Sequence, residues 1–286
     1  MLPTIALLAA NAFLPDPLVH LETGKPIRTR AEWDSQRAAI RAAYEKYVFG
    51  RIPPAPGNLK ASVLSEERLG RLTLRKVLLE FGPDRKARLH LELALPPGAG
   101  PFPVFLTNHP RARPWAATAV RRGYAACIYQ AQDPRYGPSD DSESYKTAYP
   151  DYDFSMIARW AWSASRAIDY LETVPSLDKT KIAISGHSRN GKQALLAAAL
   201  DPRIGAIALS SGNTGEGNPW RYTTEAFWNE SIEQITTGFP EWFHPNLKQF
   251  IGREHELPVD QNLLMALVAP RGLLLASAYS EAQGAP

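Results

Sequence analysis

One serine in this chain lies among residues whose types and spacing suit ester hydrolysis. The run G-H-S-R-N-G-K, from Gly186 to Lys192, places Ser188 in a predicted sharp turn beside basic side chains. The pattern G-x-S-x-G holds a serine in a strained bend, from which its hydroxyl can attack a carbonyl carbon. Asn190 occupies the last glycine position of that pattern, and Gly191 follows it. Because asparagine tolerates left-handed backbone, we expect the turn to form; a turn without chemistry is the alternative.

The segments on either side of Ser188 predict the elements that would hold it. Before the serine, residues 182–184 form a short apolar run that is rich in β-branched side chains, which is typical of a buried strand. After Gly191, the run K-Q-A-L-L-A-A-A-L consists of strong helix formers and ends just before Pro202. The sequence therefore predicts a strand, a tight turn and a helix in succession, with Ser188 at the turn.

The motif at this turn resembles the signature G-x-S-R-x-G-K of the glucuronoyl esterases and their bacterial relatives. Every specified position of the signature is matched between Gly186 and Lys192, while His187 stands where many members have cysteine. The resemblance extends to three further segments, at Leu14–Leu18, Tyr44–Pro54 and Leu257–Arg271. Taken together these segments are specific and span most of the chain. The sequence is thus similar to a bacterial-type member of carbohydrate esterase family 15, the 4-O-methyl-glucuronoyl methylesterases.

The resemblance implies roles for four residues near the turn. Ser188 would be the nucleophile, and Arg189 would stabilise the oxyanion through its amide and its guanidinium. Lys192 would bind sugar hydroxyls or a uronate group, with a surface helix lysine as the alternative. Glu230 matches a substrate-contacting glutamate of bacterial members, with a solvated helix residue as the alternative. No metal and no organic cofactor is implied.

The acid and the base of a serine esterase are harder to place. Chain order puts the acid just after the predicted strand at residues 272–278, where Glu281 lies. Some members of the family carry an acid before the glycine of the loop that follows residue 210, where this chain has Ser211. The catalytic histidine of the family is expected beyond Pro286, after a further helix and strand. The sequence therefore predicts an esterase domain that lacks its last strand and helix.

Histidines within the chain are the alternative source of a base. His187 adjoins the nucleophile, but neighbouring side chains on a tight turn diverge, so we expect it to pack against the sheet. His244 and His255 fall in a predicted cap region and are weaker candidates. His90 lies in the polar register of a strand and is interpreted as a surface residue. The loop at residues 108–109 follows a central strand, so a backbone amide of Asn108 or His109 is a candidate for the oxyanion hole.

The order of predicted elements indicates a single α/β domain over residues 1–286. Alternating segments within Leu59–Leu95 have a period of two, which predicts antiparallel strands with one wet face. From residue 103 onward, buried strands alternate with helices, which predicts a mostly parallel sheet with helices on both faces. We therefore expect an α/β-hydrolase fold, a three-layer sandwich whose N-terminal part is antiparallel.

Four segments outside the strands have their own predictions. Residues 1–57 would form an N-terminal helical and extended segment, and residues 213–256 a cap or insertion. The polar residues from Gln130 to Asp153 are expected to form a long loop that faces the substrate or the solvent. Residues Leu257–Arg271 are expected to form a helix that leads into the last predicted strand.

Composition narrows the classes of function. Lys and Arg number 32 against 29 Asp and Glu, and no basic block is present, which gives nucleic-acid binding no support. Cys127 is the only cysteine, so an intrachain disulfide is excluded, and we expect it to be buried. No stretch approaches the roughly 20 apolar residues of a membrane span. The apolar N-terminus has no preceding Lys or Arg and is broken at Asn11, which disfavours a signal peptide and leaves the compartment open.

The sequence thus predicts a serine carboxylic-ester hydrolase that acts through an acyl-enzyme. Its partner would be a carbohydrate ester, a glucuronoyl ester of plant cell-wall xylan and lignin, and we expect a monomer that binds neither nucleic acid nor membrane. An acetyl xylan esterase or general carboxylesterase on the same fold is one alternative, because a fold does not fix a substrate. A non-catalytic carbohydrate-binding or inactive domain is the other, and the missing histidine favours it.

Overall fold

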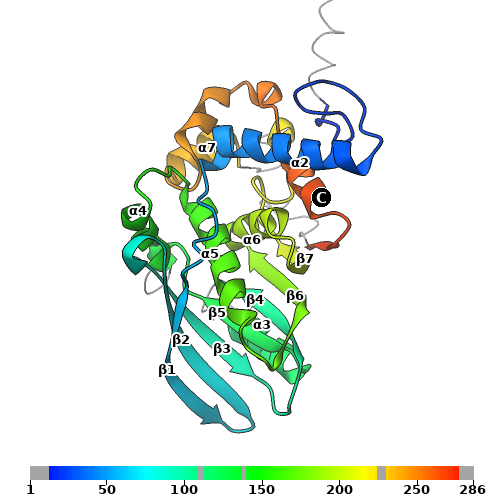
Figure 1. Cartoon of the computed structure of the whole chain (residues 1–286). Helices are drawn as coiled ribbons and strands as arrows, with labels where there is room; N and C mark the ends of the chain where they lie inside the picture. The colour runs from blue at the N-terminus through cyan, green and yellow to red at the C-terminus, as the bar shows by residue number, and fades with distance from the viewer. Residues whose placement is uncertain (1–12, 109–112, 137–139, 224–229, 277–286) are drawn as a thin grey trace, which may run out of the picture.

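Figure 1 shows a central sheet with helices around it in the computed structural model of the chain. The structure describes residues 13–108, 113–136, 140–223 and 230–276. The strands are β1 (Lys60–Leu69), β2 (Leu72–Phe81), β3 (Ala87–Leu95), β4 (Phe102–Thr107), β5 (Ala125–Tyr129), β6 (Leu177–His187), β7 (Ile204–Ser210) and β8 (Gly272–Ala276). The helices are α2 (Arg30–Tyr44), α3 (Arg113–Arg121), α4 (Ser144–Ala148), α5 (Met156–Leu171), α6 (Arg189–Leu200), α7 (Ile232–Gly238) and α8 (Gln261–Val268).

The strands form one mixed sheet in the order β1-β2-β3-β5-β4-β6-β7-β8. The pairs β1–β2, β2–β3 and β3–β5 are antiparallel, and the pairs from β5 through β4, β6 and β7 to β8 are parallel. Parallel neighbours need crossover connections, which here contain α3, α5, α6 and α8. The predicted antiparallel N-terminal part and parallel second half are both confirmed.

The two faces of the sheet are covered by different helices. In β3, the buried side chains of Leu89 and Leu91 belong to the main core, which includes the apolar residues of α5 and α6. On the opposite face, Ala116 of α3 packs against Ala126 and Ile128 of β5. This arrangement follows from the alternation of side chains along a strand, and it confirms the predicted three-layer sandwich.

Two helices, α5 and α6, form the layer that packs on the sheet beside the turn at Ser188. α5 is buried over most of its surface, and it packs beside α6 in the main core (Figure 1). The Trp160 indole of α5 is fully buried, and its Nε1 donates to Asp140 Oδ2 at 2.8 Å. Because α6 is held by α5 on one side and the sheet on the other, its N-terminus has a fixed position relative to the end of β6.

The N-terminal helix and the segment after β7 lie at the same end of the molecule, opposite the β1–β2 hairpin (Figure 1). α2 begins with a capping box, in which the Thr29 hydroxyl accepts from the Glu32 N–H and the Glu32 carboxylate accepts from the Thr29 N–H. Near its other end, the Tyr44 hydroxyl donates to the Asp260 carbonyl at 2.9 Å. The division into an N-terminal segment at 1–57 and a cap at 213–256 stays a prediction.

Two predictions about local structure are wrong in detail. The helix expected over Leu257–Arg271 is shorter, because Asp260 caps the first turn of α8 and Pro270 follows its end. The segment 130–153 is not an open loop, since it contains α4, whose Tyr145 is fully buried. The polar composition of the segment did not reveal this burial, because the buried contacts are made by its aromatic side chains.

Three predictions from composition can be compared with the structure. Cys127 lies in β5 and is buried, as expected, and its burial raises the pKa of the thiol to about 12. Within the described ranges, every helix is too short or too polar to cross a membrane. The prediction for the apolar N-terminus falls on residues 1–12, outside the described residues.

Candidate active site

Ser188 occupies a backbone conformation that few residues other than glycine adopt. Its φ is 57° and its ψ is −131°, between the last residue of β6 and the first residue of α6. The Ser188 N–H donates to the Ser210 carbonyl at 2.9 Å, and the Ser188 carbonyl accepts from the Lys192 N–H at 3.2 Å. A strained position of this kind costs on the order of 1–3 kcal/mol and persists where the surroundings fix it. The predicted strand, turn and helix around the serine are confirmed.

Glycine at position 186 makes the turn sterically possible. A Cβ on Gly186 would lie 2.0 Å from the Asn190 carbonyl oxygen, so a larger residue would force the backbone apart. The left-handed residue of the turn is Ser188 itself, because Asn190 has the helical backbone of α6. The Asn190 side chain has another role, since its Oδ1 accepts from Asn108 Nδ2 at 3.0 Å. Asn108 also donates to the Ala131 carbonyl at 2.8 Å and so ties the end of β4 to the elbow.

Arg189 follows the serine as the first residue of α6. The dipole and the first-turn amides of a helix favour negative charge at its N-terminus, which suits an oxyanion that forms next to Ser188. The Arg189 guanidinium lies 5.9 Å from the ring centroid of Trp242. Trp242 is fixed in turn, because it stacks on Phe239 at 3.8 Å and its Nε1 donates to Asp133 Oδ2 at 3.4 Å.

Lys192 is buried, with 1% of its surface exposed, and is not a surface helix lysine. Its ammonium donates to the carbonyl oxygens of Gly212 and Thr214 and to Glu230 Oε2, the last at 2.7 Å. Burial lowers the pKa of Lys192, while Glu230 and Glu216 act in the opposite direction. All three ammonium hydrogens thus have acceptors within the protein, and the lysine joins α6 to the loop after β7.

The loop after β7 is strained. Ser211 and Asn213 have φ values of 50° and 56°, in the left-handed region, and Gly215 has a φ of 84°. Left-handed conformation costs a non-glycine residue on the order of 1–2 kcal/mol, so two such residues require compensating contacts. Two acceptors of Lys192, the carbonyls of Gly212 and Thr214, lie within this loop, and their hydrogen bonds supply part of that compensation.

Glu216, in the same loop, is a buried acid that the sequence analysis did not single out. It is 2% exposed, and its Oε2 accepts from the Gly212 N–H at 2.7 Å. Burial raises the pKa of Glu216 to about 7, although the Gly212 amide and the nearby Lys192 ammonium favour its ionised form. The glycine-rich run from Gly212 to Gly217 was the available signal, because an acid among glycines in a short loop often contacts its own backbone.

Glu230 lies next to this loop and is one third exposed. Its carboxylate pairs with Lys192, its N–H donates to Asn213 Oδ1 at 3.2 Å, and its carbonyl accepts from Thr214 Oγ1 at 2.5 Å. The structure thus brings together the predicted residues Ser188, Arg189, Lys192 and Glu230 through α6 and the loop.

A second buried charge pair supports the same region. Arg221 Nη1 lies 3.1 Å from Asp260 Oδ2, and both side chains are almost fully buried. Asp260 also accepts from the Trp220 N–H at 3.0 Å, and its burial raises the pKa of its carboxyl. The pair joins the segment that leads toward Glu230 to the start of α8. No local pattern in the sequence pairs Arg221 with Asp260, because they lie 39 positions apart.

None of the described histidines forms a hydrogen bond with the Ser188 hydroxyl. His187 is exposed, with its Nδ1 3.2 Å from Ser210 Oγ and its ring edge-on to Trp115, so the expectation that it packs against the sheet is wrong. His244 caps a 3-10 helix and lies 3.3 Å from Asp153 Oδ2, and His255 lies 3.8 Å from Glu256 Oε1. Two candidates, Glu281 and His109, lie outside the described residues.

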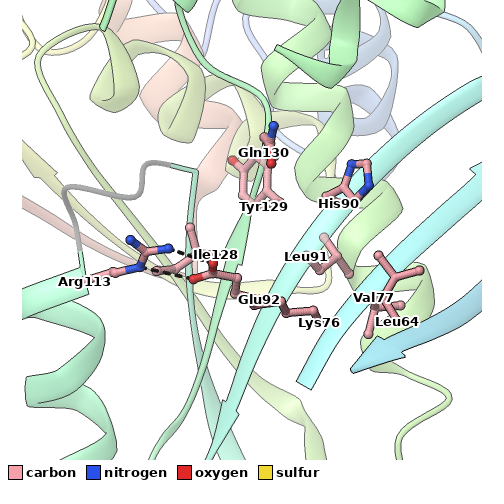
Figure 2. Close-up of a pocket in the computed structure, with 10 residues that line it drawn as sticks. All are labelled: Leu64, Lys76, Val77, His90, Leu91, Glu92, Arg113, Ile128, Tyr129 and Gln130. Carbon is pink, nitrogen blue, oxygen red and sulfur yellow. Dashed lines mark hydrogen bonds and ion pairs between the residues drawn. The ribbon is translucent and has the colours of Figure 1, made fainter. Parts of the chain in front are cut away.

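A pocket of about 360 Å³ lies away from Ser188, over β2, β3 and β5. Figure 2 shows its lining, in which Arg113 points toward Glu92, with Nη2 and Oε1 2.7 Å apart. His90 also lines it, and its Nδ1 lies 2.9 Å from Asp141 Oδ2. Ser188 does not line this pocket, so His90 and Ser188 lie on different parts of the surface. His90 is a strand residue with a partly exposed side chain, in agreement with its interpretation from the sequence.

Two features define this protein as an α/β hydrolase: the order of the parallel strands, and a serine with left-handed backbone between β6 and α6. Within that class the family can be specified. Residues 82–284 match the family model for fungal glucuronyl esterases, which covers more than half of the chain. The chain therefore belongs to the glucuronyl esterase family.

Known proteins of this family resemble the chain over nearly all of its length. A carbohydrate esterase from an unknown prokaryotic organism is 31% identical, and the match covers 94% of this chain and 73% of the relative. The 4-O-methyl-glucuronoyl methylesterase 1 of Wolfiporia cocos is 30% identical, over 92% of this chain and 65% of the relative. The chain thus spans between about two thirds and three quarters of the length of these two relatives.

A solved structure agrees with the fold. The glucuronoyl esterase from Solibacter usitatus superposes with a TM-score of 0.78 at 28% sequence identity, over 96% of this chain and 81% of that one. Both the family assignment and the fold predicted from the sequence are confirmed.

Proposed function

We propose that this chain is a serine carboxylic-ester hydrolase that cleaves esters of glucuronic acid. The observation that carries the proposal is Ser188, with its left-handed backbone at the start of α6, one helical turn from the buried Lys192 that pairs with the partly exposed Glu230. Membership of the glucuronyl esterase family supports the same chemistry. The finer substrate we propose is a glucuronoyl ester that links xylan to lignin in the plant cell wall.

The proposed reaction begins with Ser188 Oγ. This oxygen forms a bond to the ester carbonyl carbon, and the electron pair of the carbonyl moves onto its oxygen. The backbone amide of Arg189, at the N-terminus of α6, stabilises that oxyanion. The serine proton passes to a histidine outside the described residues, and that histidine then protonates the departing alcohol. Water attacks the acyl-enzyme in the same way and releases the glucuronic acid and Ser188.

Glu281 is proposed as the acid that orients the histidine, because it follows β8 in chain order. The parallel strands β6, β7 and β8 end at the same edge of the sheet, so the end of β8 is at the edge where β7 ends and the Ser188 turn begins. A carboxylate in this position would favour the imidazolium that forms when Ser188 loses its proton.

Substrate recognition is assigned to Glu230 and Lys192. Glu230 is one third exposed, so its carboxylate can accept hydrogen bonds from sugar hydroxyls. Lys192 has acceptors for all of its ammonium hydrogens, and in this proposal it orients Glu230 and exchanges part of its contacts when sugar binds. The fungal relative named 4-O-methyl-glucuronoyl methylesterase supports a uronate ester as the substrate class.

The experiment is hydrolysis of the benzyl ester of glucuronic acid by the full chain, compared with Ser188→Ala. We expect turnover by the wild type and its loss in the variant, while Ser62→Ala on the exposed strand β1 keeps wild-type rates. Turnover that survives in Ser188→Ala would refute Ser188 as the nucleophile. Faster hydrolysis of acetylated xylose than of the glucuronate, unaffected by Lys192→Ala, would favour an acetyl esterase instead.

A binding protein without turnover is the second candidate. The observation in its favour is that no histidine in the described ranges contacts the Ser188 hydroxyl, and an unassisted serine is a weak nucleophile. It predicts that a folded wild-type chain binds methyl glucuronate in calorimetry but hydrolyses no ester. Addition of free imidazole as a general base provides a further test, because it should restore some turnover if only the base is missing.

A further inference from the structure

Glu216 is a buried carboxylate that the proposed reaction does not use. One of its oxygens accepts from the Gly212 N–H, and the other, Oε1, has no hydrogen-bond partner among the described residues. A Cβ on Gly191 would lie 1.8 Å from Oε1, and a Cβ on Gly212 would lie 2.2 Å from the carboxyl carbon. The carboxylate therefore fills the space between the first turn of α6 and the loop after β7, and two glycines leave room for it.

Lys192 and Glu216 form hydrogen bonds with the backbone of the same residue, Gly212. Glu216 accepts from the N–H of Gly212, and the Lys192 ammonium donates to the carbonyl of Gly212. On either side of Gly212 are Ser211 and Asn213, the two non-glycine residues of the loop whose backbone is in the left-handed region. Strained backbone persists only where its surroundings over-determine it, and here the two buried charged side chains provide that restraint.

The restrained loop carries the contacts that position Glu230. Asn213 Oδ1 accepts the Glu230 N–H, and the Thr214 hydroxyl donates to the Glu230 carbonyl. We infer that Glu216 is a positioning residue, which together with Lys192 holds residues 211–215 in the conformation that places Glu230 for the sugar. The inference rests on the proposed function, because that proposal assigns Glu230 to the substrate.

The position of Glu216 also gives it an influence on the charge of Lys192. The charged groups described around it are Lys192 of α6, Glu230 beyond the loop, and Arg189, which acts on Lys192. An ionised Glu216 favours the ammonium form of Lys192, in addition to the effect of Glu230. At a pH where Glu216 is ionised, its charge therefore opposes the lowering of the Lys192 pKa by burial.

The first test compares Glu216→Ala with the wild type in hydrolysis of the benzyl glucuronate and in amide exchange. We expect KM to rise about tenfold or more while kcat changes by less than about threefold, because Glu230 moves and Ser188 does not. Amide hydrogens of residues 211–215 should exchange at least about tenfold faster, because the loop loses a restraint. Glu233→Gln, an exposed carboxyl on α7, is the control and should change neither quantity.

The conservative variant Glu216→Gln separates shape from charge. Glutamine keeps an acceptor for Gly212 but has no charge, so near pH 6, where wild-type Glu216 is mostly protonated, its KM should match the wild type within about twofold. On the alkaline side, its KM should rise at lower pH than that of the wild type, because Lys192 loses the nearby negative charge that favours its ammonium form. If Glu216 acted through packing alone, the rise of KM at alkaline pH would occur at the same pH in Glu216→Gln and in the wild type.

The outcomes for the inference and for the proposed function are separable. If the wild type hydrolyses nothing, the proposed function fails, and the exchange of residues 211–215 in the two variants alone decides the inference. If Glu216→Ala does not fold, Glu216→Gln decides it through the pH dependence of exchange and of KM. Exchange and KM that equal the wild type in both variants at every pH would overturn the positioning role.

Discussion

Replacement of Glu216 by glutamine should change how the stability of this protein depends on pH. Burial raises the pKa of Glu216 to about 7 in the folded protein, from 4.5 for an unperturbed carboxyl. The interval between these values, at about 1.36 kcal/mol for each pH unit, corresponds to about 3 kcal/mol in the free energy of unfolding. Because the contribution comes from one group, a variant without a titratable carboxyl should reveal it.

The direction of the change in unfolding free energy with pH follows from which state, folded or unfolded, binds the Glu216 proton more tightly. The folded-state pKa is the higher one, so the folded protein holds the proton in the window between 4.5 and about 7. The stabilisation from that proton is complete below about pH 4.5 and is lost as the pH rises through about 7. Relative to Glu216→Gln, which keeps an acceptor for the Gly212 N–H, the wild type should lose about 3 kcal/mol across the window.

The assay is urea unfolding of the wild type and of Glu216→Gln at intervals from about pH 4.5 to about pH 8.5. Subtraction of the two free-energy curves removes the contributions of all groups whose titration the substitution leaves unchanged. Glu233→Gln is the matched control, and its difference from the wild type should be flat, because Glu233 is exposed on α7. A difference for Glu216→Gln that stays within about 0.5 kcal/mol over the whole range would refute the argument from burial.

Three further predictions concern the elbow and the core. Gly186→Ala should lower the free energy of unfolding by roughly 3 kcal/mol or more and reduce ester hydrolysis, because the new Cβ would lie 2.0 Å from a backbone carbonyl oxygen. Tyr129→Phe should cost about 1–3 kcal/mol, since it removes a buried hydroxyl that donates to Gln193 Oε1 at 2.7 Å and leaves that acceptor unpaired. Cys127 should resist Ellman's reagent near pH 8, because burial raises its thiol pKa to about 12.

Each of these predictions has a control. Gly205→Ala is the counterpart of Gly186→Ala, because the nearest atoms to its Cβ are at 3.7 Å, and it should be tolerated. Tyr124→Phe, at a side chain that is 39% exposed, should leave stability within about 0.5 kcal/mol of the wild type. The thiol should react fully in urea. Equal effects in a variant and its control, or a thiol that reacts in the native state, would contradict the corresponding prediction.

The strands, the helices and the elbow could be predicted because their signals are local. The run at residues 182–184, the glycine at 186 and the helix formers after Gly191 lie within about twenty positions, and together they predict β6, the turn and α6. The prediction erred in two places, one decided by a local helix cap and the other by a contact between segments that are distant in the sequence. α8 is shorter than its pattern because the Asp260 side chain caps its first turn, and Tyr145 in the segment after β5 is buried because its ring packs edge-on against Trp162 of α5.

The surroundings of Ser188 could not be predicted from the same local signals. Lys192, Thr214 and Glu230 are up to 38 positions apart, and only the packing of α6 against the loop after β7 brings them together. The burial of Glu216 and the left-handed backbone of Ser211 depend on the same packing. No local pattern distinguishes a buried acid from an exposed one in a glycine-rich loop, because burial is a property of the neighbours and not of the residue.

The sequence by itself therefore determined the class of the fold, the position of the turn that carries Ser188, and the family. The fold class and the turn depend on the period of apolar residues, on the backbone freedom of glycine and on the order of elements, and the family on the resemblance of short motifs; all of these are written along the chain. The tertiary structure decided which charges are paired, which acid carries a raised pKa and where each histidine lies. Those properties arise from solvent exclusion and from contacts between distant segments, which exist only once the chain has folded.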